Sequence, residues 1–135
     1  MLDFTYEGNP AELPGLTLAY IGDAVYELYV RQQMLKKSIT AHTLHQLTVE
    51  RVNNNTQAAL LLKLEPELTE LEQSIVRRGR NAKGIVPKNA DVQTYRKSTG
   101  MEALVGYLYL VKDEERLNWV LEQIEEVTGH ANHKL

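Results

Sequence analysis

Two carboxylates, Asp23 and Glu102, lie in surroundings where an acid is costly, which makes them the first candidates for chemistry in this chain. Each stands in a nearly apolar stretch, Asp23 within residues 16–30 and Glu102 within residues 101–111. The first stretch has no clear polar face, so we expect it to form a helix central to the core with Asp23 carried inward. A buried carboxylate without a partner is unfavourable, because burial penalises the charged form.

A glycine accompanies each of these carboxylates. Gly22 directly precedes Asp23, and Gly106 follows Glu102 by four residues, on the same helix face. Interior glycines cost a helix about 1 kcal/mol each relative to alanine, so both indicate a close approach of another backbone. If the two helices meet at these glycines, Asp23 and Glu102 face each other. Two carboxylates forced together must share a proton, find cations or hold a metal.

The composition predicts one folded unit. A chain of 135 residues with 43% hydrophobic content can form a single core, so we expect one domain over 1–135, with an N-terminal extension over 1–13 and a frayed tail over 130–135. The lack of cysteine excludes disulfides and thiolate metal sites and is compatible with a reducing compartment. The chain starts without a signal-like apolar run, and its apolar stretches are too short to span a bilayer. These features predict a soluble cytoplasmic protein without a membrane partner.

Positive charge is concentrated in one part of a chain whose net charge is −3. Residues 77–97 contain seven lysines and arginines against one aspartate, a local charge of +6, which leaves −9 for the remainder. Phosphates respond to the near field rather than to the total charge, so this basic block favours phosphate binding. The alternative is an ordinary solvated loop.

Helix signals recur along the chain and no period-two strand pattern is found, so the predicted fold class is all-α. Thr69 with Glu72 three residues later is a capping-box signature. Asn89 or Asp91 can cap the helix that carries Glu102. The expected helices cover about 16–36, 43–64 (bent or divided at the asparagines 53–55), 69–78, a segment from 89 or 91 to 111, and 113–129, with a loop over 79–89.

Several motifs resemble the ribonuclease III family. The segment 20–25 (YIGDAV) resembles the first signature of that family, and the segment 102–106 (EALVG) resembles the second. Both occur in the family's order, separated by a helical region of suitable length. The stretches 78–83 and 87–96 are similar to the compact subfamily called Mini-ribonuclease III, and the chain ends where ordinary members carry a double-stranded-RNA-binding domain.

The resemblance implies a ribonuclease III endonuclease-domain-like helical bundle that forms a homodimer. It implies an endoribonuclease that cleaves double-stranded RNA with Mg²⁺, or with Mn²⁺ in its place, and leaves 5′-phosphate and 3′-hydroxyl ends. The implied substrate is the 23S ribosomal RNA precursor, with a ribosomal protein as a helper. Asp23 and Glu102 match catalytic, metal-binding carboxylates of the family, and Tyr20 matches an aromatic residue that enters the partner subunit.

Three family carboxylates are missing from this chain. Leu16 and Ala19 stand at positions where the family usually has glutamate, and Thr99 stands where it has aspartate. A site with two carboxylates leaves more of the metal shell to water and RNA phosphates, which Mg²⁺ tolerates. Glu27, one turn after Asp23, is a further candidate: without binding the metal directly, it could orient the ligands by hydrogen bonding. Its alternative is an edge carboxylate that pairs with a lysine.

The basic block supplies the candidate RNA contacts. A-form RNA presents phosphates and sugar hydroxyls across a shallow minor groove, so recognition here should depend mainly on shape and charge. The candidates for phosphate contact are Arg78, Arg80, Lys83, Lys88 and Arg96, and those for hydroxyl or base-edge contact are Asn81 and Gln93.

Two alternative functions remain open. One is a catalytically silent RNA-binding or ribosome-associated dimer. The other is an unrelated all-α interaction protein whose acids pair with Arg31 or Arg96.

Overall fold

The computed structural model describes residues 2–82 and 84–129, and within this part every regular element is helical. The predicted all-α fold class is therefore confirmed. Among the described residues, no helix has both the length and the hydropathy that crossing a bilayer requires. The elements are η1 (Pro10–Glu12), α1 (Gly15–Met34), α2 (Ala41–Val52), α3 (Asn54–Leu64), η2 (Glu65–Glu67), α4 (Glu70–Asn81), α5 (Val92–Leu110), α6 (Glu114–Leu121) and α7 (Ile124–Val127).

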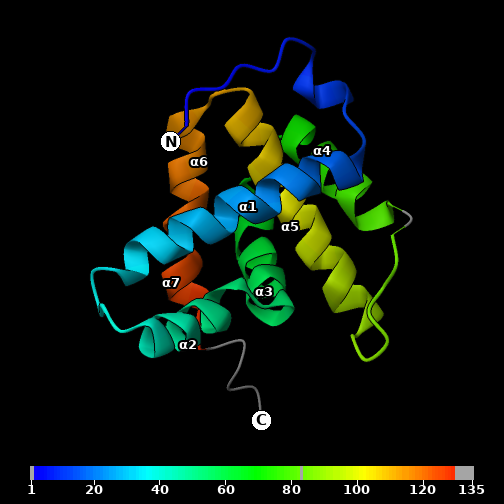
Figure 1. Cartoon of the computed structure of the whole chain (residues 1–135). Helices are drawn as coiled ribbons and strands as arrows, with labels where there is room; N and C mark the ends of the chain where they lie inside the picture. Colours follow the sequence, from blue (N-terminus) through cyan, green and yellow to red (C-terminus); the bar gives the residue numbers. More distant parts are fainter. Residues whose placement is uncertain (1, 83, 130–135) are drawn as a thin grey trace.

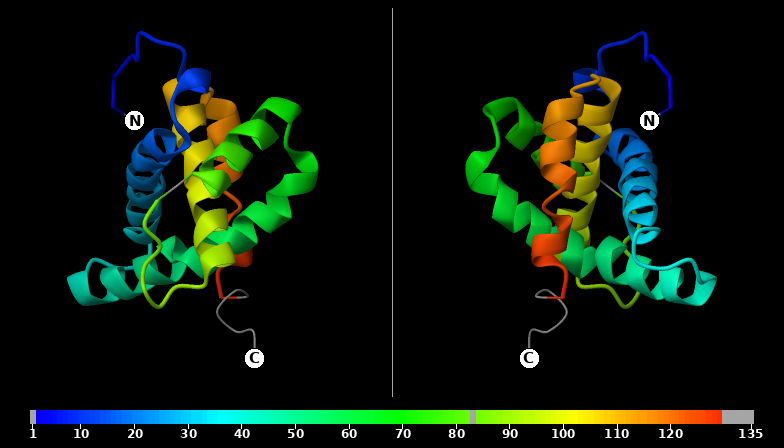
Figure 2. Two further views of the ribbon diagram at one scale, coloured as in Figure 1. Left: turned by 90° about the vertical axis from the view of Figure 1, so that its right-hand side faces the viewer. Right: turned by 90° about the vertical axis from the view of Figure 1, so that its left-hand side faces the viewer.

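Helix α5 is the central element (Figure 1). It packs against α1, α3, α4 and α6, and the views in Figure 2 show these helices arranged around it. Met101, Leu104 and Leu108 on α5 are almost completely buried, and so is the Ala103 side chain on another of its faces. A helix buried on several sides needs an apolar surface nearly all round, which explains why the segment around Glu102 has so few polar residues.

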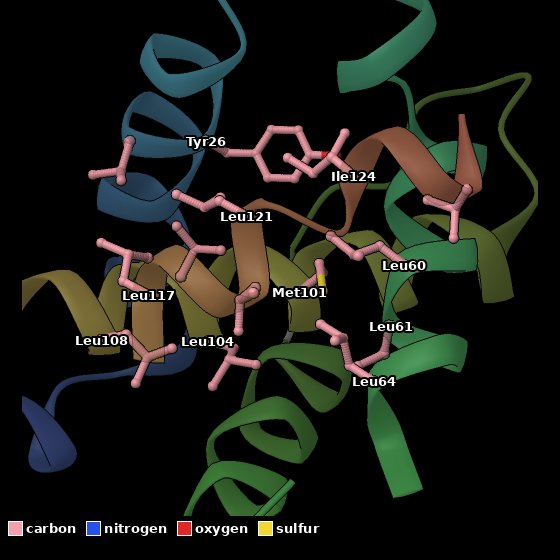
Figure 3. Close-up of a cluster of buried hydrophobic side chains, with 14 of the residues drawn as sticks. Tyr26, Leu60, Leu61, Leu64, Met101, Leu104, Leu108, Leu117, Leu121 and Ile124 are labelled. Atoms are coloured by element: carbon pink, nitrogen blue, oxygen red, sulfur yellow. The ribbon is translucent and has the colours of Figure 1, made fainter. Parts of the chain in front are cut away.

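The main core lies where α1, α3, α5, α6 and α7 converge (Figure 3). A smaller apolar cluster fills the contact of α1 with α4 and α5, around Leu18 and Ile75. Together the two clusters fix α1 and α3 on different sides of α5, which is the arrangement that positions the candidate site. Figure 3 labels Tyr26, Leu60, Leu61, Leu64, Met101, Leu104, Leu108, Leu117, Leu121 and Ile124.

Side-chain caps mark the starts of α3, α4, α5 and α6. Residues 41–64 form two helices, because the Asn53 side chain accepts from the Thr56 amide at 2.9 Å and starts α3. The capping box of Thr69 and Glu72 is present, and α4 continues to Asn81, three residues beyond the expected end. Asp91, rather than Asn89, caps α5. The single helix expected over 113–129 is wrong, because the chain breaks at residues 122–123 between α6 and α7.

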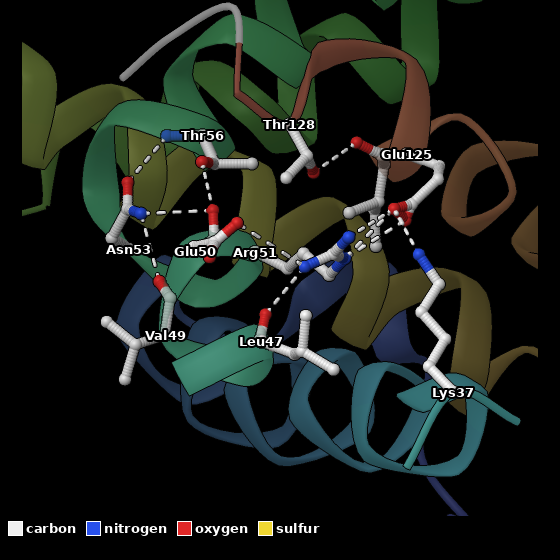
Figure 4. Close-up of polar contacts among 10 residues, drawn as sticks. Lys37, Leu47, Val49, Glu50, Arg51, Asn53, Thr56, Glu125 and Thr128 are labelled. Atoms are coloured by element: carbon white, nitrogen blue, oxygen red, sulfur yellow. Dashed lines mark hydrogen bonds and ion pairs between the residues drawn. The ribbon is translucent and has the colours of Figure 1, made fainter. Parts of the chain in front are cut away.

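A cluster of charges joins α2 to α7 (Figure 4). Arg51 on α2 is only 6% exposed, and its Nε donates to both carboxylate oxygens of Glu125 at 3.0 Å. It also donates to the Leu47 carbonyl at 2.8 Å, while Lys37 lies 3.5 Å from Glu125. The hydrogen bond from Arg51 holds the pKa of the Glu125 carboxyl below its usual range. This acid is thus neutralised by cations of the chain itself.

Candidate active site

Helices α1 and α5 cross at the two glycines that the sequence singled out. A Cβ atom on Gly22 would overlap the carbonyl oxygen of Glu102, and one on Gly106 would overlap the carbonyl oxygen of Leu18. Only hydrogen fits at either position, so the backbones are in direct contact. The predicted close approach at both glycines is confirmed.

This crossing brings the carboxyl groups of Asp23 and Glu102 together. The two side chains are hydrogen-bonded to each other, one from α1 and one from α5. Glu102 is half-buried, but Asp23 is exposed, so the expectation that Asp23 is carried into the core is wrong. The reason is that one side of α1 is apolar but largely uncovered by the other described elements: Tyr20 is 77% exposed and Leu28 is partly exposed at the edge of α2. The sequence of α1 therefore has the apolar pattern of a fully buried helix, although part of its surface is exposed.

The environment of Glu102 favours its protonated form. Burial, followed by the hydrogen bond and the negative charge of Asp23, raises the pKa of Glu102 to about 8. The amide of Gln57, whose Nε2 donates to Glu102 Oε2 at 3.4 Å, acts in the opposite direction. Glu102 is therefore largely protonated at neutral pH, and its carboxyl group can donate the hydrogen bond to Asp23.

Within the described ranges, no lysine, arginine or histidine forms an ion pair with Asp23 or Glu102. Arg31, one of the two cations considered as a partner, is instead bound to Glu27, with its Nε donating at 2.8 Å. The ordinary alternative for Glu27, a carboxylate paired with a nearby cation, is what the structure shows, with an arginine in place of a lysine. The carboxylate pair of the site is therefore left without a cation from these residues.

The donor set of the site suits a hard divalent cation that keeps most of its waters. Among the described residues, no three histidine, aspartate or glutamate side chains are placed so that they could hold a metal ion together. Leu16 is exposed, Ala19 is buried, and the Thr99 hydroxyl donates to a backbone carbonyl one turn earlier at 3.1 Å. None of these three positions adds a carboxylate. Two oxygen ligands with an open solvent side on Asp23 fit Mg²⁺, which commonly uses only one or two carboxylates.

The basic block is divided between structural and free side chains. Arg78 donates through its guanidinium to the backbone carbonyls of Ala11 and Leu13, at 3.0 Å for the latter, and so holds the segment before α1. Arg80 lies 3.7 Å from Glu65, a partly exposed ion pair. Anchoring the N-terminal segment is a role of Arg78 that its sequence context did not reveal.

Other residues of the block surround a hollow of about 350 Å³ between the end of α4 and the start of α5. Asn81 and Arg96 line it, and Leu16 and Thr99 form part of its wall. Lys88 and Gln93 are exposed nearby in sequence, on the connecting loop and the first turn of α5. Lys83 lies outside the described residues. The hollow thus places polar and basic side chains around two of the positions at which family carboxylates are absent.

Two buried polar residues near Glu102 were missed by sequence reasoning, namely Tyr26 and Gln57. The Tyr26 hydroxyl donates to the Arg51 carbonyl at 2.7 Å, and burial together with the charge of Glu102 raises the pKa of Tyr26. Gln57 precedes Leu60 and Leu61 by three and four residues, so it lies on the apolar stripe of α3. A polar residue on such a stripe was a signal that the sequence already contained.

Comparison with known proteins gives matches over most of the chain. The family described as Ribonuclease III domain matches residues 16–113. A Mini-ribonuclease 3 of Symbiobacterium thermophilum is 53% identical over 116 residues, covering 84% of this chain and 89% of the relative. A Mini-ribonuclease 3 of Enterococcus faecalis is 42% identical, covering 91% and 96%. A crystal structure of a protein from Fusobacterium nucleatum superposes with a TM-score of 0.79 at 30% identity, covering 85% and 93%.

Proposed function

Because this chain belongs to the ribonuclease III family, in its Mini-ribonuclease III group, and is an endoribonuclease, we propose that Asp23 and Glu102 form its metal-dependent catalytic site. The substrate class is double-stranded RNA and the cofactor is Mg²⁺, with Mn²⁺ able to replace it. One observation supports this proposal above the others. The crossing of α1 and α5 holds two carboxyl groups in contact, and no described cation of the chain pairs with them.

The two carboxylates have different parts in this proposal. Asp23 is exposed and is therefore reachable by RNA and by a hydrated ion, whereas the half-buried Glu102 must give up a proton before it can act as a ligand. A bound divalent cation supplies activation of water and neutralisation of charge on the phosphodiester. Neither carboxylate acts as a covalent nucleophile, and the products carry 5′-phosphate and 3′-hydroxyl ends. Glu27, through its pair with Arg31, fixes the next turn of α1.

We assign RNA binding to the basic block around the hollow. Arg80, Lys88, Arg96 and the undescribed Lys83 would contact phosphates, while Asn81 and Gln93 would contact sugar hydroxyls or base edges. Arg78 would contribute through its positive field, since its guanidinium is bound to backbone carbonyls. The natural substrate that we propose is the base-paired stalk of the 23S ribosomal RNA precursor in the cytoplasm, with a ribosomal protein assisting. This choice rests on the resemblance to the Mini-ribonuclease III group, whose members match most of the chain.

We also propose that the chain acts as a homodimer through the uncovered side of α1. Tyr20 is 77% exposed, Leu16 and Leu28 are exposed on the same helix, and so is Leu35 directly after it. Leu28 and Leu35 also line an apolar hollow of about 380 Å³ against α2. A second copy of the chain would bury these side chains, with Tyr20 inserted into the partner. Sedimentation should show a dimer for the native chain and a shift towards monomer for Tyr20→Arg, which adds a charge without removing a core contact.

The test of the catalytic proposal is cleavage of an end-labelled, base-paired RNA stalk with and without Mg²⁺. Asp23→Asn and Glu102→Gln keep the size of each side chain and remove its charge, so metal-dependent cleavage should be lost in both. Glu125→Gln, which removes a carboxylate that pairs with Arg51 and Lys37, is the matched control and should cleave normally. Tight RNA binding without cleavage by the native chain would favour the silent RNA-binding dimer. Absence of both would refute the proposed function.

A further inference from the structure

Helix α3 carries a buried amide beside the site. Gln57 is 1% exposed and lies on the same face as Leu60 and Leu61, which are also fully buried. Burying a primary amide costs free energy unless its donors and acceptors are paired. A leucine or methionine at this position would continue the apolar stripe, so a reason other than core packing is needed for the glutamine.

The described partner of that amide is Glu102. Gln57 Nε2 donates to Oε2 of Glu102 at 3.4 Å, across the contact of α3 with α5. Tyr26, the other buried polar side chain close to Glu102, is already committed, because its hydroxyl donates to the Arg51 carbonyl at 2.7 Å. Among the described residues, the side-chain hydrogen bonds of Glu102 are therefore those with Asp23 and Gln57.

The backbone and the side chain of Glu102 are thus fixed by different helices. Its backbone is held by α1, because the Glu102 carbonyl lies against Gly22. Its carboxylate has several rotatable bonds beyond the backbone, and the crossing alone does not fix them. The amide on α3 contacts Oε2, and Asp23 on α1 contacts the same carboxyl group.

We infer that Gln57 is a positioning residue, whose amide on α3 orients the Glu102 carboxylate as a metal ligand opposite Asp23. This inference rests on the proposed function, since it takes Glu102 to be a ligand. Groups that hydrogen-bond to ligating side chains fix their orientation, and their loss typically weakens metal binding by about 10–100-fold. The effect should be pronounced here, because a site with two carboxylates has no third ligand to compensate for a misplaced one.

The experiment measures Mn²⁺ binding to the whole protein without RNA, by the electron paramagnetic resonance signal of the free ion. Gln57→Met keeps the length and most of the volume of the side chain but has no N–H donor. We expect its Mn²⁺ affinity to fall by about 10-fold or more. The Mg²⁺ concentration for half-maximal cleavage should rise by a similar factor, while RNA affinity measured without metal stays unchanged.

Thr56→Val is the matched control. Thr56 is the preceding residue on α3 and is equally buried, but its hydroxyl donates to the Glu50 carbonyl at 2.7 Å rather than to the site. Its replacement should lower thermal stability and leave Mn²⁺ affinity unchanged. If Gln57→Met does not fold, Gln57→Asn keeps an amide in the core but is one methylene too short to reach Glu102, and the same loss of affinity is expected.

Two results would overturn the inference, and they differ in what else they affect. Native-like Mn²⁺ affinity in folded Gln57→Met or Gln57→Asn, with loss of binding in Glu102→Gln, would refute the role of Gln57 alone. Native-like affinity in Glu102→Gln would show that Glu102 is not a ligand, and the proposed function and the inference would both fail.

Discussion

Glu125 and Glu102 both lie at contacts between helices, but Glu125 faces Arg51 and Lys37 whereas Glu102 faces Asp23. The pKa of Glu125 is held below its usual range by the hydrogen bond from Arg51, and the pKa of Glu102 is raised to about 8 by burial and by Asp23. Glu72 behaves like Glu125: burial raises its pKa, but hydrogen bonds from Arg116 and Thr69 outweigh this, and the net pKa is lowered.

The difference separates structural acids from the acids of the site. An acid paired with an arginine stabilises the folded chain at neutral pH, because its charge is compensated from within. The Asp23–Glu102 pair is compensated by a proton, which a metal ion can replace. No cation of the described residues pairs with Asp23 or Glu102, and we propose that this property makes the pair a metal site. The predictions below test it against the acids that are paired with arginine.

The largest expected difference is in catalysis. Asp23→Asn and Glu102→Gln should each lower kcat/KM for duplex RNA by more than about 100-fold, since loss of a ligand should exceed the loss of a group that only orients one. Glu125→Gln and Arg116→Lys should stay within about threefold of the native value. Single-turnover cleavage of a labelled duplex measures these values. A similar loss of kcat/KM in the site variants and in Glu125→Gln or Arg116→Lys would contradict the distinction between site acids and structural acids.

The second prediction concerns the crossing that creates the pair. Gly22→Ala places a methyl group on the Glu102 carbonyl, so the helices must separate, and the free energy of unfolding should fall by about 3 kcal/mol with loss of cleavage. Gly84→Ala is the control, because its Cβ would meet Leu16 side-chain atoms at 3.5 Å, an ordinary contact. Urea denaturation measures both variants. A native-like Gly22→Ala would contradict the close crossing.

The third prediction is that neutralising the two acids changes stability in opposite directions. At pH 8 without metal, Glu102→Gln should raise the free energy of unfolding by about 2 kcal/mol, since it removes a poorly solvated charge and repulsion from Asp23. Glu125→Gln should lower it by about 1 kcal/mol, because it leaves the buried Arg51 without its carboxylate, although Glu125 itself is half exposed. Urea denaturation with EDTA present measures both changes in the free energy of unfolding. A change in the same direction for both variants would refute the comparison.

The smallest expected effect is the pH dependence of stability. The folded pKa of Glu102 lies above its unfolded value near 4.5, so its stabilising contribution is complete below pH 4.5 and is lost as pH rises through about 8. The pKa of Glu125 is lowered, so its contribution is present above pH 4.5 and is lost as pH falls. Between pH 6 and 8 without metal, stability should fall by up to about 1 kcal/mol per pH unit. Glu102→Gln, or saturating Mg²⁺, should reduce this slope, and an unchanged slope would contradict the assignment.

The sequence predicted the helical fold and the carboxylate pair because both depend on local signals. Glycines within apolar helices indicated the crossing, and the capping box at Thr69 indicated the start of α4. The exposure of Asp23 could not be predicted in this way. Apolar side chains such as Tyr20 and Leu28 have the same pattern whether they face the core or an uncovered surface, so the whole of α1 resembled a buried helix.

The other features that could not be predicted are polar contacts between residues far apart in the sequence. The Arg78 guanidinium holds the carbonyls of Ala11 and Leu13, more than sixty positions earlier, and no local pattern in the basic block distinguishes it from its neighbours. The contact of Gln57 with Glu102 spans 45 positions. The amide on an apolar stripe was visible in the sequence, but its partner depends on how α3 packs against α5.

The crossing at Gly22 and Gly106 also determines when the site comes into existence. Asp23 is synthesised early, whereas Glu102 lies on a helix that is made only after α1 to α4 are complete. Chains are made from the N-terminus, and contacts between distant segments form only after both are available. A nascent chain that ends before α5 carries half of the carboxylate pair and no crossing helix. On the proposed site, the nuclease gains its activity only when α5 has been made and has crossed α1.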